Sequence, residues 1–272
     1  MNRQIEFFKP QKTLPVSVTG QSCSLNCAHC GGHFLKAMVP IEEALKEAEK
    51  RKVSSCLISG GCDKKGRVPI GKPRAEEAAY LKKDYKINMH VGMLEDYDID
   101  EVCRLADVIS LDIPVSTKVI REVYGLDYER DDYINLYSKL RAKTKVVPHI
   151  CLGLTDSPEL EDENILLEKL SEIKPDNLCY IIFTPVAGTL FENKKPPVAA
   201  KVQTIFKKTV EVLSETRIYL GCMRPGGKYR DEIDIAAVEA GLDGIVMPSK
   251  KAIERVKELG IESVWKQECC VF

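Results

Sequence analysis

The sequence has little net charge and no long apolar run. Its 272 residues carry 40 lysines and arginines against 41 aspartates and glutamates, which gives a formal net charge of −1. Acidic and basic residues are interspersed, so there is no basic stripe of the kind that binds a phosphate backbone. No stretch approaches the ~20 consecutive apolar residues of a membrane helix. We therefore expect neither nucleic acid nor a membrane as a partner.

A secretory signal is also missing from the first residues, MNRQIEFFKPQKTLP, where Glu6 and Pro10 interrupt any apolar segment. We expect a cytoplasmic protein. The eleven cysteines are an odd number, which argues against a disulfide framework in such a chain. Thiols that bind a metal or fill the core are the better interpretations.

Short apolar runs alternate with longer amphipathic segments along the chain. Strands alternating with helices predict parallel pairing with right-handed crossovers. Runs that are apolar throughout are typical of strands buried on both faces. The predicted strands cover residues 16–20, 54–59, 87–92, 107–113, 145–154, 177–183, 217–222 and 244–248. The predicted helices cover residues 40–52, 74–83, 98–106, 116–123, 130–142, 157–173, 198–214, 230–240 and 249–258.

The fold class is therefore α/β, and the simplest closure is a (β/α) TIM-type barrel of parallel strands, full or nearly full. An open doubly wound sheet is the alternative. No linker composition marks a boundary inside the repeat. We expect a single barrel domain over residues 1–260 and a cysteine-containing tail over residues 261–272, which ends in ECCVF.

A cysteine motif follows the first predicted strand, in the segment TGQSCSLNCAHCGGHF (19–34). Cys23, Cys27 and Cys30 have the spacing C-x3-C-x2-C. In a parallel barrel this places them at the C-terminal mouth, where active sites form. Three thiolates in a short loop suit a cubane iron–sulfur cluster and leave its fourth iron without a protein ligand. The alternative is a structural zinc site that adds His29 or His33 to the three cysteines.

The spacing and placement of Cys23, Cys27 and Cys30 resemble the radical S-adenosylmethionine superfamily. The resemblance implies that these cysteines hold a catalytic [4Fe–4S] cluster whose free iron binds S-adenosylmethionine. A low-potential electron donor would then drive cleavage to a 5′-deoxyadenosyl radical that abstracts hydrogen from the substrate. His29 lies at the position of an aromatic residue that packs on the adenine, and an imidazole can do the same.

Three further motifs resemble this superfamily and imply contacts with S-adenosylmethionine. ISGGCD (58–63) resembles its GGE-type motif, with Gly60 and Gly61 beside the methionine and Cys62 in place of the usual glutamate. Asp112, in SLDIP (110–114), falls where biotin synthase binds the ribose. Gly153, in KVVPHICLGL (145–154), would lie against the adenine, and FTPVAGT (183–189) resembles a motif at the sixth strand.

The resemblance to biotin synthase extends from about residue 15 to residue 258. That enzyme holds a second, [2Fe–2S] cluster with three cysteines and an arginine. The matching positions here are Ile58, Asn88, Val147 and Cys222, so we expect no such cluster.

Other cysteines offer a different second cluster. Cys222 closes the seventh predicted strand, Cys62 ends the second, and the tail supplies Cys269 and Cys270. These four thiols would hold a second [4Fe–4S] cluster, or they would remain without a metal. The other cysteines fall within strand or helix patterns and are expected in the core: Cys56, Cys103, Cys151 and Cys179.

The chain's size, its GCMRP segment and the C-terminal cysteine pair resemble one component of the archaeal-type two-subunit lipoyl synthase. This resemblance implies sulfur insertion into an octanoyl chain on a carrier protein or peptide, together with a companion radical S-adenosylmethionine subunit. One alternative is a radical enzyme that modifies a small molecule without sulfur transfer, as hydrogenase maturases do. Another is a non-catalytic metal-binding scaffold.

Two features stay open from the sequence alone. His149 points either into the barrel or into packing. The segment containing Lys194 and Lys195 is either a solvated loop, which we favour, or a surface that docks a carrier protein.

Overall fold

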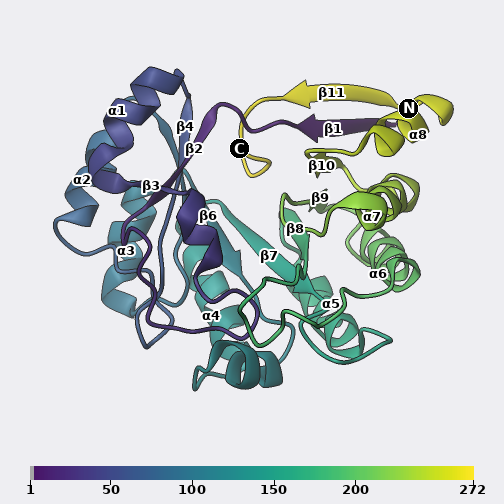
Figure 1. Ribbon diagram of the computed structural model, residues 1–272, viewed down its shortest axis with the longest axis horizontal. Helices are drawn as coiled ribbons and strands as arrows, with labels where there is room; N and C mark the ends of the chain where they lie inside the picture. The colour runs from purple at the N-terminus through teal and green to yellow at the C-terminus, as the bar shows by residue number, and fades with distance from the viewer. Residues whose placement is uncertain (1–2) are drawn as a thin grey trace.

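The computed structural model describes residues 3–272 and consists of one curled parallel sheet with helices on its outer face (Figure 1). The eleven strands follow the order β11-β1-β10-β9-β8-β7-β6-β5-β4-β2-β3. Their bounds are β1 (Gln4–Phe8), β2 (Thr13–Ser17), β3 (Val39–Pro40), β4 (Ser55–Ser59), β5 (Lys86–His90), β6 (Val108–Asp112), β7 (Val146–Leu152), β8 (Asn177–Ile182), β9 (Arg217–Leu220), β10 (Gly244–Val246) and β11 (Glu262–Lys266). The predicted α/β barrel of parallel strands is confirmed.

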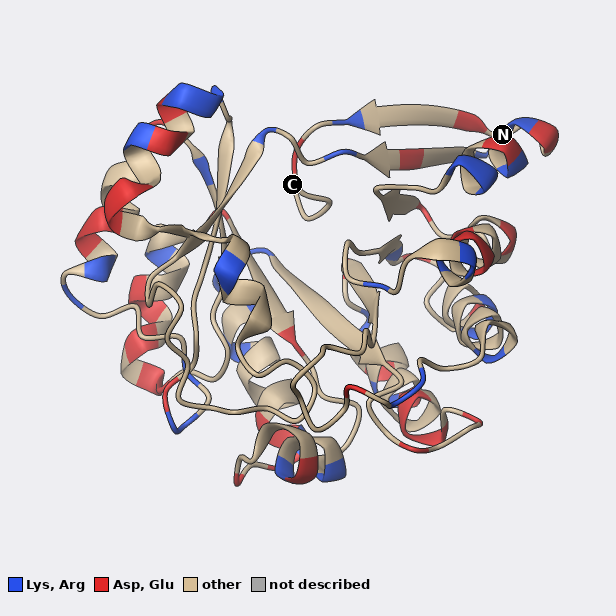
Figure 2. Cartoon of the chain, viewed as in Figure 1, with Lys and Arg blue, Asp and Glu red and all other residues tan. Residues whose placement is uncertain are grey.

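Helices connect most successive strands, as the alternation in the sequence predicts. They are α1 (Ile41–Arg51), α2 (Arg74–Leu81), α3 (Asp96–Leu105), α4 (Arg130–Arg141), α5 (Glu161–Ile173), α6 (Ala199–Val212), α7 (Gly227–Ala240) and α8 (Lys250–Glu258), with a 3₁₀ helix η1 (His33–Ala37) and a π-helix η2 (Val119–Tyr124). Lysines and arginines mix with aspartates and glutamates on the outer helices (Figure 2). Among the described residues, no helix combines the length and apolarity needed to cross a membrane.

Three strands lie outside the predicted repeat, the two-residue β3 and the longer β1 and β11. β1 precedes the first predicted strand, and β11 lies within the segment expected as a tail. They pair with each other, and β1 also pairs with β10. A glutamate in its centre hides β1 from a search for apolar runs. Glu6 is buried, and it forms ion pairs with Arg217 and Lys266 at 2.9 and 2.5 Å.

The sheet remains open between its edge strands β3 and β11, and the last residues bridge the gap near β2 and β4. The backbone N–H of Lys12 donates to the carbonyl of Gln267, and that of Cys269 donates to Thr13 Oγ1. Glu268 Oε2 lies 2.6 Å from Lys86 Nζ on β5. Cys270 and Val271 are buried among residues of the sheet's concave face. The true tail is thus residues 267–272, which fold inside the curled sheet.

A buried ion pair holds together the chain just after β9 and the end of β10. Arg224 Nε donates to Asp234 Oδ1 on α7 over 2.6 Å, and neither side chain is exposed. The same guanidinium donates to the carbonyls of Gly221 and Val246. It therefore ties the segment that contains Cys222 to the end of β10.

Asp234→Ala is expected to destabilise the chain by about 3–5 kcal/mol, because it leaves the Arg224 charge buried without its partner. The free energy of unfolding in urea measures this loss. Glu101→Ala, which breaks the exposed pair with Arg104, is the control and should cost about 0–1 kcal/mol. Equal effects of the two substitutions would contradict the structural role of Arg224.

Candidate functional site

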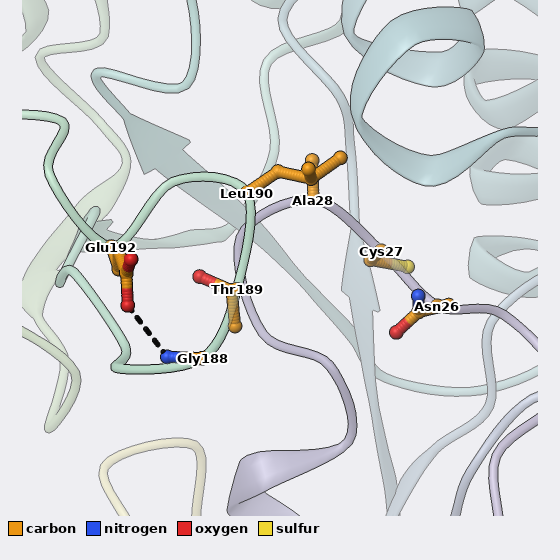
Figure 3. Close-up of a pocket in the computed structure, with 7 residues that line it drawn as sticks. All are labelled: Asn26, Cys27, Ala28, Gly188, Thr189, Leu190 and Glu192. Atoms are coloured by element: carbon orange, nitrogen blue, oxygen red, sulfur yellow. Dashed lines mark hydrogen bonds between the residues drawn. The ribbon is translucent and has the colours of Figure 1, made fainter.

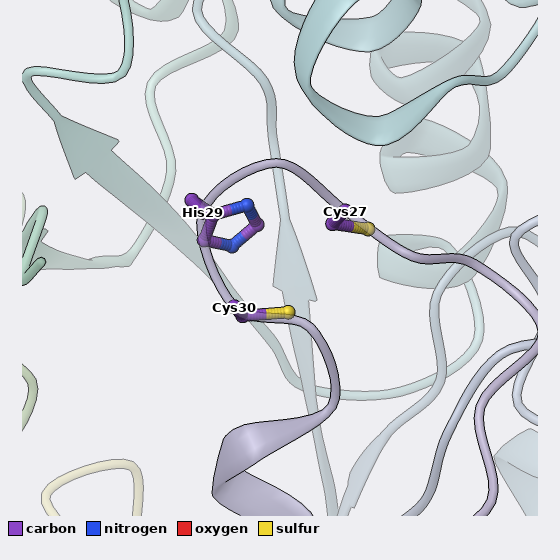
Figure 4. Close-up of side chains that lie close together, drawn as sticks. All are labelled: Cys27, His29 and Cys30. Carbon is purple, nitrogen blue, oxygen red and sulfur yellow. The ribbon is translucent and has the colours of Figure 1, made fainter. Parts of the chain in front are cut away.

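The three-cysteine loop follows β2 and lies at the C-terminal end of the sheet. Ligand atoms of Cys27, His29 and Cys30 lie within 4.8 Å of one another (Figure 4). Cys27 accepts backbone hydrogen bonds from Cys30 and Gly31, which gives the loop its tight turn. Ala28 joins the loop to its surroundings, because its N–H donates to Val123 and its carbonyl accepts from Phe191. The loop is therefore held from two sides.

The thiols of the loop interact with one another. Cys23 is exposed, whereas Cys27 and Cys30 are half-buried. A hydrogen bond from the Cys27 thiol lowers the pKa of Cys30, and the same hydrogen bond raises the pKa of Cys27. Thiols that compete for protons in this way favour a thiolate, the form in which cysteine binds metals. Three soft ligands on one short loop suit a [4Fe–4S] cluster and leave one of its irons without a protein ligand.

A glycine allows the end of β4 to lie directly on this loop. A Cβ at Gly61 would approach the carbonyl oxygen of Ser22 to 2.0 Å and Cβ of Cys23 to 2.7 Å. The N–H of Gly61 donates to Thr19 Oγ1 over 2.7 Å. Only glycine fits at such a close approach of two backbones. The structure thus places the Gly60–Gly61 turn beside the cysteine loop, whereas the predicted contact with the methionine part stays a prediction.

His29 presents an unsatisfied polar atom at the site. Its Nδ1 is buried and has no hydrogen-bond partner among the described residues. Burial lowers the pKa of His29 to about 4, so the ring is neutral at pH 7. The ring packs on Tyr124, with the ring centroids 5.5 Å apart. A neutral aromatic ring with a free nitrogen fits a nucleobase, which offers both a π face and hydrogen-bonding groups.

Asp112 stands at the end of β6 between two histidines. His90 Nε2 lies 3.4 Å from Asp112 Oδ1, and the Asp112 side chain is 45% exposed. Burial opposes ionisation of Asp112, but the nearby His90, His149 and His29 outweigh it and lower its pKa. Asp112 is therefore a carboxylate that can accept hydrogen bonds from hydroxyl groups, as the ribose assignment requires.

His149 lies on the concave face of the sheet, which resolves its two possible orientations. Its register partners are Asp112 on β6 and Cys179 on β8, and its ring is 5.5 Å from that of His90. Its Nδ1 lies 3.0 Å from the Val147 carbonyl, so Nδ1 carries the proton in the neutral ring and Nε2 is free. No pattern in the sequence predicted that His90 would join this cluster.

Gly153 follows β7 in a conformation that other residues rarely adopt, with φ at +88°. A Cβ there would meet Pro197 Cδ at 2.4 Å. The N–H of Gly153 donates to Glu163 Oε1 over 3.0 Å, while Glu163 Oε2 is buried and has no hydrogen-bond partner within residues 3–272. Gly153 is therefore held in place by α5 and by the loop that precedes α6.

That loop, which leaves β8, also lies beside the cysteine loop. A pocket of about 270 Å³ separates them and is lined by Asn26, Cys27, Ala28, Gly188, Thr189, Leu190 and Glu192 (Figure 3). Gly188 N–H donates to Glu192 within the loop. Lys194 donates to the Thr155 carbonyl, and its side chain is only 15% exposed. Lys194 thus ties this loop to the segment that follows β7 and does not form part of a free basic surface.

A second group of thiols lies inside the curled sheet. The Cys179 and Cys269 thiols lie close enough to Cys270 to shift its pKa, and Cys222 is close enough to interact electrostatically with Cys269 and Cys270. Cys179 and Cys270 are buried in the same cluster of concave-face residues. Cys179 was expected in the core, and its apolar strand gave no sign of these neighbours.

The structure does not bring Cys62 to this second group, which corrects the predicted set of four. β4 pairs with β2, so the residues after β4 meet the first cysteine loop instead. The Cys62 carbonyl accepts from Ser24 N–H over 2.7 Å and from the Cys23 thiol over 3.8 Å. Burial and the neighbouring Cys23 raise the pKa of Cys62. Cys179 takes its place beside Cys222, Cys269 and Cys270.

No family model matches the chain. A tRNA-2-methylthio-N(6)-dimethylallyladenosine synthase from Clostridium tetani is 28% identical over 147 residues, which are 53% of this chain and 31% of that protein. The match thus spans about a third of the relative's length.

Several solved structures share the fold. Methylornithine synthase PylB has a TM-score of 0.63 at 14% identity, over 98% of this chain and 85% of its own. The hydrogenase maturase HydG of Carboxydothermus hydrogenoformans has a TM-score of 0.65 at 17% identity, over 96% and 67%. Streptococcus suis SuiB, solved with S-adenosylmethionine bound, has a TM-score of 0.59 at 17% identity, over 81% and 52%.

The fold alone does not fix the chemistry, since an HMG-CoA lyase from Bacillus subtilis matches with a TM-score of 0.56 at 9% identity, over 93% and 88%. The comparisons therefore show the fold, and any assignment of a reaction depends on the cysteine loop. The comparisons support no particular substrate and no lipoyl synthase in particular.

Gly61→Ala is expected to lower the iron bound by the chain several-fold, because the new Cβ displaces the backbone of Ser22 and Cys23. Iron and sulfide are measured after anaerobic reconstitution. Gly71→Ala is the control, since a Cβ at Gly71 would meet no atom of the described residues within 4 Å. Full iron loading of Gly61→Ala would show that the contact between β4 and the cysteine loop is dispensable.

Burial raises the pKa of Glu163. The folded chain therefore holds this proton more tightly than the unfolded chain, and stability falls as the pH rises above about 4.5. Glu163→Gln should remove the contribution of this carboxyl to the fall in the free energy of unfolding with pH. That contribution is at most about 1.4 kcal/mol per pH unit. Urea unfolding of the metal-free chain between pH 4.5 and 8 measures this, with exposed Glu172→Gln as the control. If the free energy of unfolding of wild type and of Glu163→Gln changed with pH in the same way, burial of Glu163 would not disfavour its ionised form.

Proposed function

We propose that this chain is a radical S-adenosylmethionine enzyme that inserts sulfur into an octanoyl chain carried by a protein or peptide. The observation that supports the proposal best is the presence of two separate thiol groups in one curled sheet. Cys23, Cys27 and Cys30 lie at the strand ends, whereas Cys179, Cys222, Cys269 and Cys270 lie on the concave side. His149, near Asp112 and next to Cys179 in register, lies between them.

Each residue of the first group has a defined task in this proposal. Cys23, Cys27 and Cys30 hold the cluster, which with S-adenosylmethionine supplies the hydrogen-abstracting radical. Gly60 and Gly61 keep the end of β4 close enough for backbone contact with the methionine part.

The nucleoside part of S-adenosylmethionine is assigned to three other residues. Asp112 accepts hydrogen bonds from the ribose, and Gly153 lies against the adenine. His29 packs on the adenine from the other side, where its neutral ring avoids placing a charge beside the sulfonium.

The second thiol group is assigned to the sulfur source, a second [4Fe–4S] cluster. Soft thiolates suit such a cluster. The tail supplies Cys269 and Cys270, and its docking inside the sheet depends on the bonds of residues 267–271 with Lys12, Thr13, Lys86 and Lys145. Ile181, which is partly buried beside this group, adds apolar surface that suits an alkyl chain.

The partners follow from this chemistry: an octanoylated or lipoylated carrier, a low-potential electron donor and a companion radical S-adenosylmethionine subunit. A cytoplasmic setting would keep the thiols reduced. The similar Clostridium tetani protein is named for the synthesis of a methylthio nucleoside, which accords with sulfur chemistry.

A second candidate is modification of a small molecule without sulfur transfer, which the structural likeness to HydG favours. In that case the chain would keep all its sulfide during turnover. A non-catalytic metal-binding scaffold would cleave no S-adenosylmethionine under strong reductant.

The second cluster predicts about eight irons per chain after anaerobic reconstitution, because two cubanes carry four irons each. Cys222→Ala should reduce the count to about four, and Cys103→Ala, on α3 away from both groups, should leave it unchanged. About four irons in both wild type and Cys222→Ala would refute the second cluster.

A turnover experiment tests whether an octanoylated peptide is the substrate. The reconstituted chain is incubated anaerobically with reductant, S-adenosylmethionine and an octanoylated lysine peptide, with and without the companion subunit. Mass spectrometry should show one or two added sulfur atoms, matched by loss of sulfide from the protein. An unmodified peptide in both reactions, despite cleavage of S-adenosylmethionine, would contradict sulfur insertion into this substrate.

A further inference from the structure

Cys62 is a fourth thiol at the first cysteine loop, beyond the three that define the motif. It is half-buried, and its sulfur is near enough to interact electrostatically with Cys23, Cys27 and Cys30. Its backbone carbonyl accepts hydrogen bonds from both Ser24 N–H and the Cys23 thiol. The function proposed above gives Cys62 no task.

The backbone on both sides of Cys62 is anchored, so its position is built into the fold. On one side, Gly61 packs on Cys23 and donates to Thr19. On the other side, Asp63 receives two backbone N–H bonds, from Lys65 and Arg67, and pairs with the Arg67 guanidinium at 2.7 Å. A thiol held this firmly beside three others is well placed to bind the same metal centre.

The spacing of the thiols favours a cluster over a single ion. Four thiolates around one zinc ion, each at about 2.3 Å from the metal, must converge closely. Among the described residues, only Cys27, His29 and Cys30 have ligand atoms that all lie within 4.8 Å, so Cys23 and Cys62 stand farther out. The corners of a cubane are more widely separated, and four such thiols match its four irons.

We propose that Cys62 is an exchangeable fourth ligand of this cluster. The proposal rests on the function proposed above. While S-adenosylmethionine is absent, the Cys62 thiolate occupies the iron that Cys23, Cys27 and Cys30 leave free. When the amino and carboxylate groups of S-adenosylmethionine bind that iron, Cys62 leaves it.

The exchange balances without any redox partner. When Cys62 binds the iron, its S–H bond breaks, the proton goes to water and an iron–sulfur bond forms. When Cys62 leaves the iron, the iron–sulfur bond breaks, the sulfur keeps the electron pair, and the sulfur takes a proton from water. The consequence is that the fourth iron is protected from loss and from other ligands until the cosubstrate arrives.

Mild ferricyanide oxidation of the reconstituted full chain tests this, because an unprotected fourth iron is lost and leaves a [3Fe–4S] cluster with its own electron paramagnetic resonance signal. Without S-adenosylmethionine, Cys62→Ala should give several-fold more of this signal than wild type or the control Cys103→Ser. With S-adenosylmethionine, all variants should be protected. Equal signals from wild type and Cys62→Ala would overturn the proposal.

Binding of S-adenosylmethionine is the second measurement. If about 90% of the wild-type clusters carry Cys62, removing this competitor should lower the Kd about tenfold. An unchanged or higher Kd in both Cys62→Ala and Cys62→Ser would count against exchange. Failure of both variants to bind iron even with S-adenosylmethionine would show a permanent four-thiolate site and overturn the proposal. Cleavage of S-adenosylmethionine by the unaltered chain checks the proposed function separately.

Discussion

The contact between Gly61 and the backbone of Cys23 is the interaction on which the candidate site depends. It exists because β4 pairs with β2, so that the segments following these strands emerge side by side. Because Gly61 has no side chain, the two backbones can lie in contact. This contact also places Cys62 beside the three-cysteine loop. Parallel pairing then brings Asp112 and the start of the Gly153 loop to the same end of the sheet. Successive parallel pairings thus bring together residues that are more than a hundred positions apart in the chain.

Closure of the sheet is the second constraint. β1 and β11 extend the sheet beyond the repeat, and residues 267–272 bridge the remaining opening. This route buries Cys270 and Val271 beside Cys179. The tail therefore helps to complete the core and, at the same time, brings thiols to the concave face. The buried Arg224–Asp234 pair fixes the segment from which Cys222 faces the tail.

The sequence was sufficient for the fold and the first cysteine loop, because strong patterns encode both. Apolar runs separated by helical periodicity predicted β4 through β10, and the C-x3-C-x2-C spacing marked the loop. It was insufficient for β1, because the charge of its central Glu6 is neutralised by Arg217 and Lys266, which lie far along the chain. The placement of Cys62 and Cys179 was also beyond it. Which thiols meet depends on strand register and on the path of the tail, and neither follows from local spacing.

Reductive cleavage of S-adenosylmethionine is the measurement that tests the central claim most directly. The anaerobically reconstituted chain is mixed with S-adenosylmethionine and a strong reductant, and 5′-deoxyadenosine and methionine are quantified. We predict that both products form in equal amounts, and that Cys30→Ala forms neither. A chain that binds four or more irons but yields no 5′-deoxyadenosine would contradict the account, since the cysteine loop would then hold a metal centre without radical chemistry.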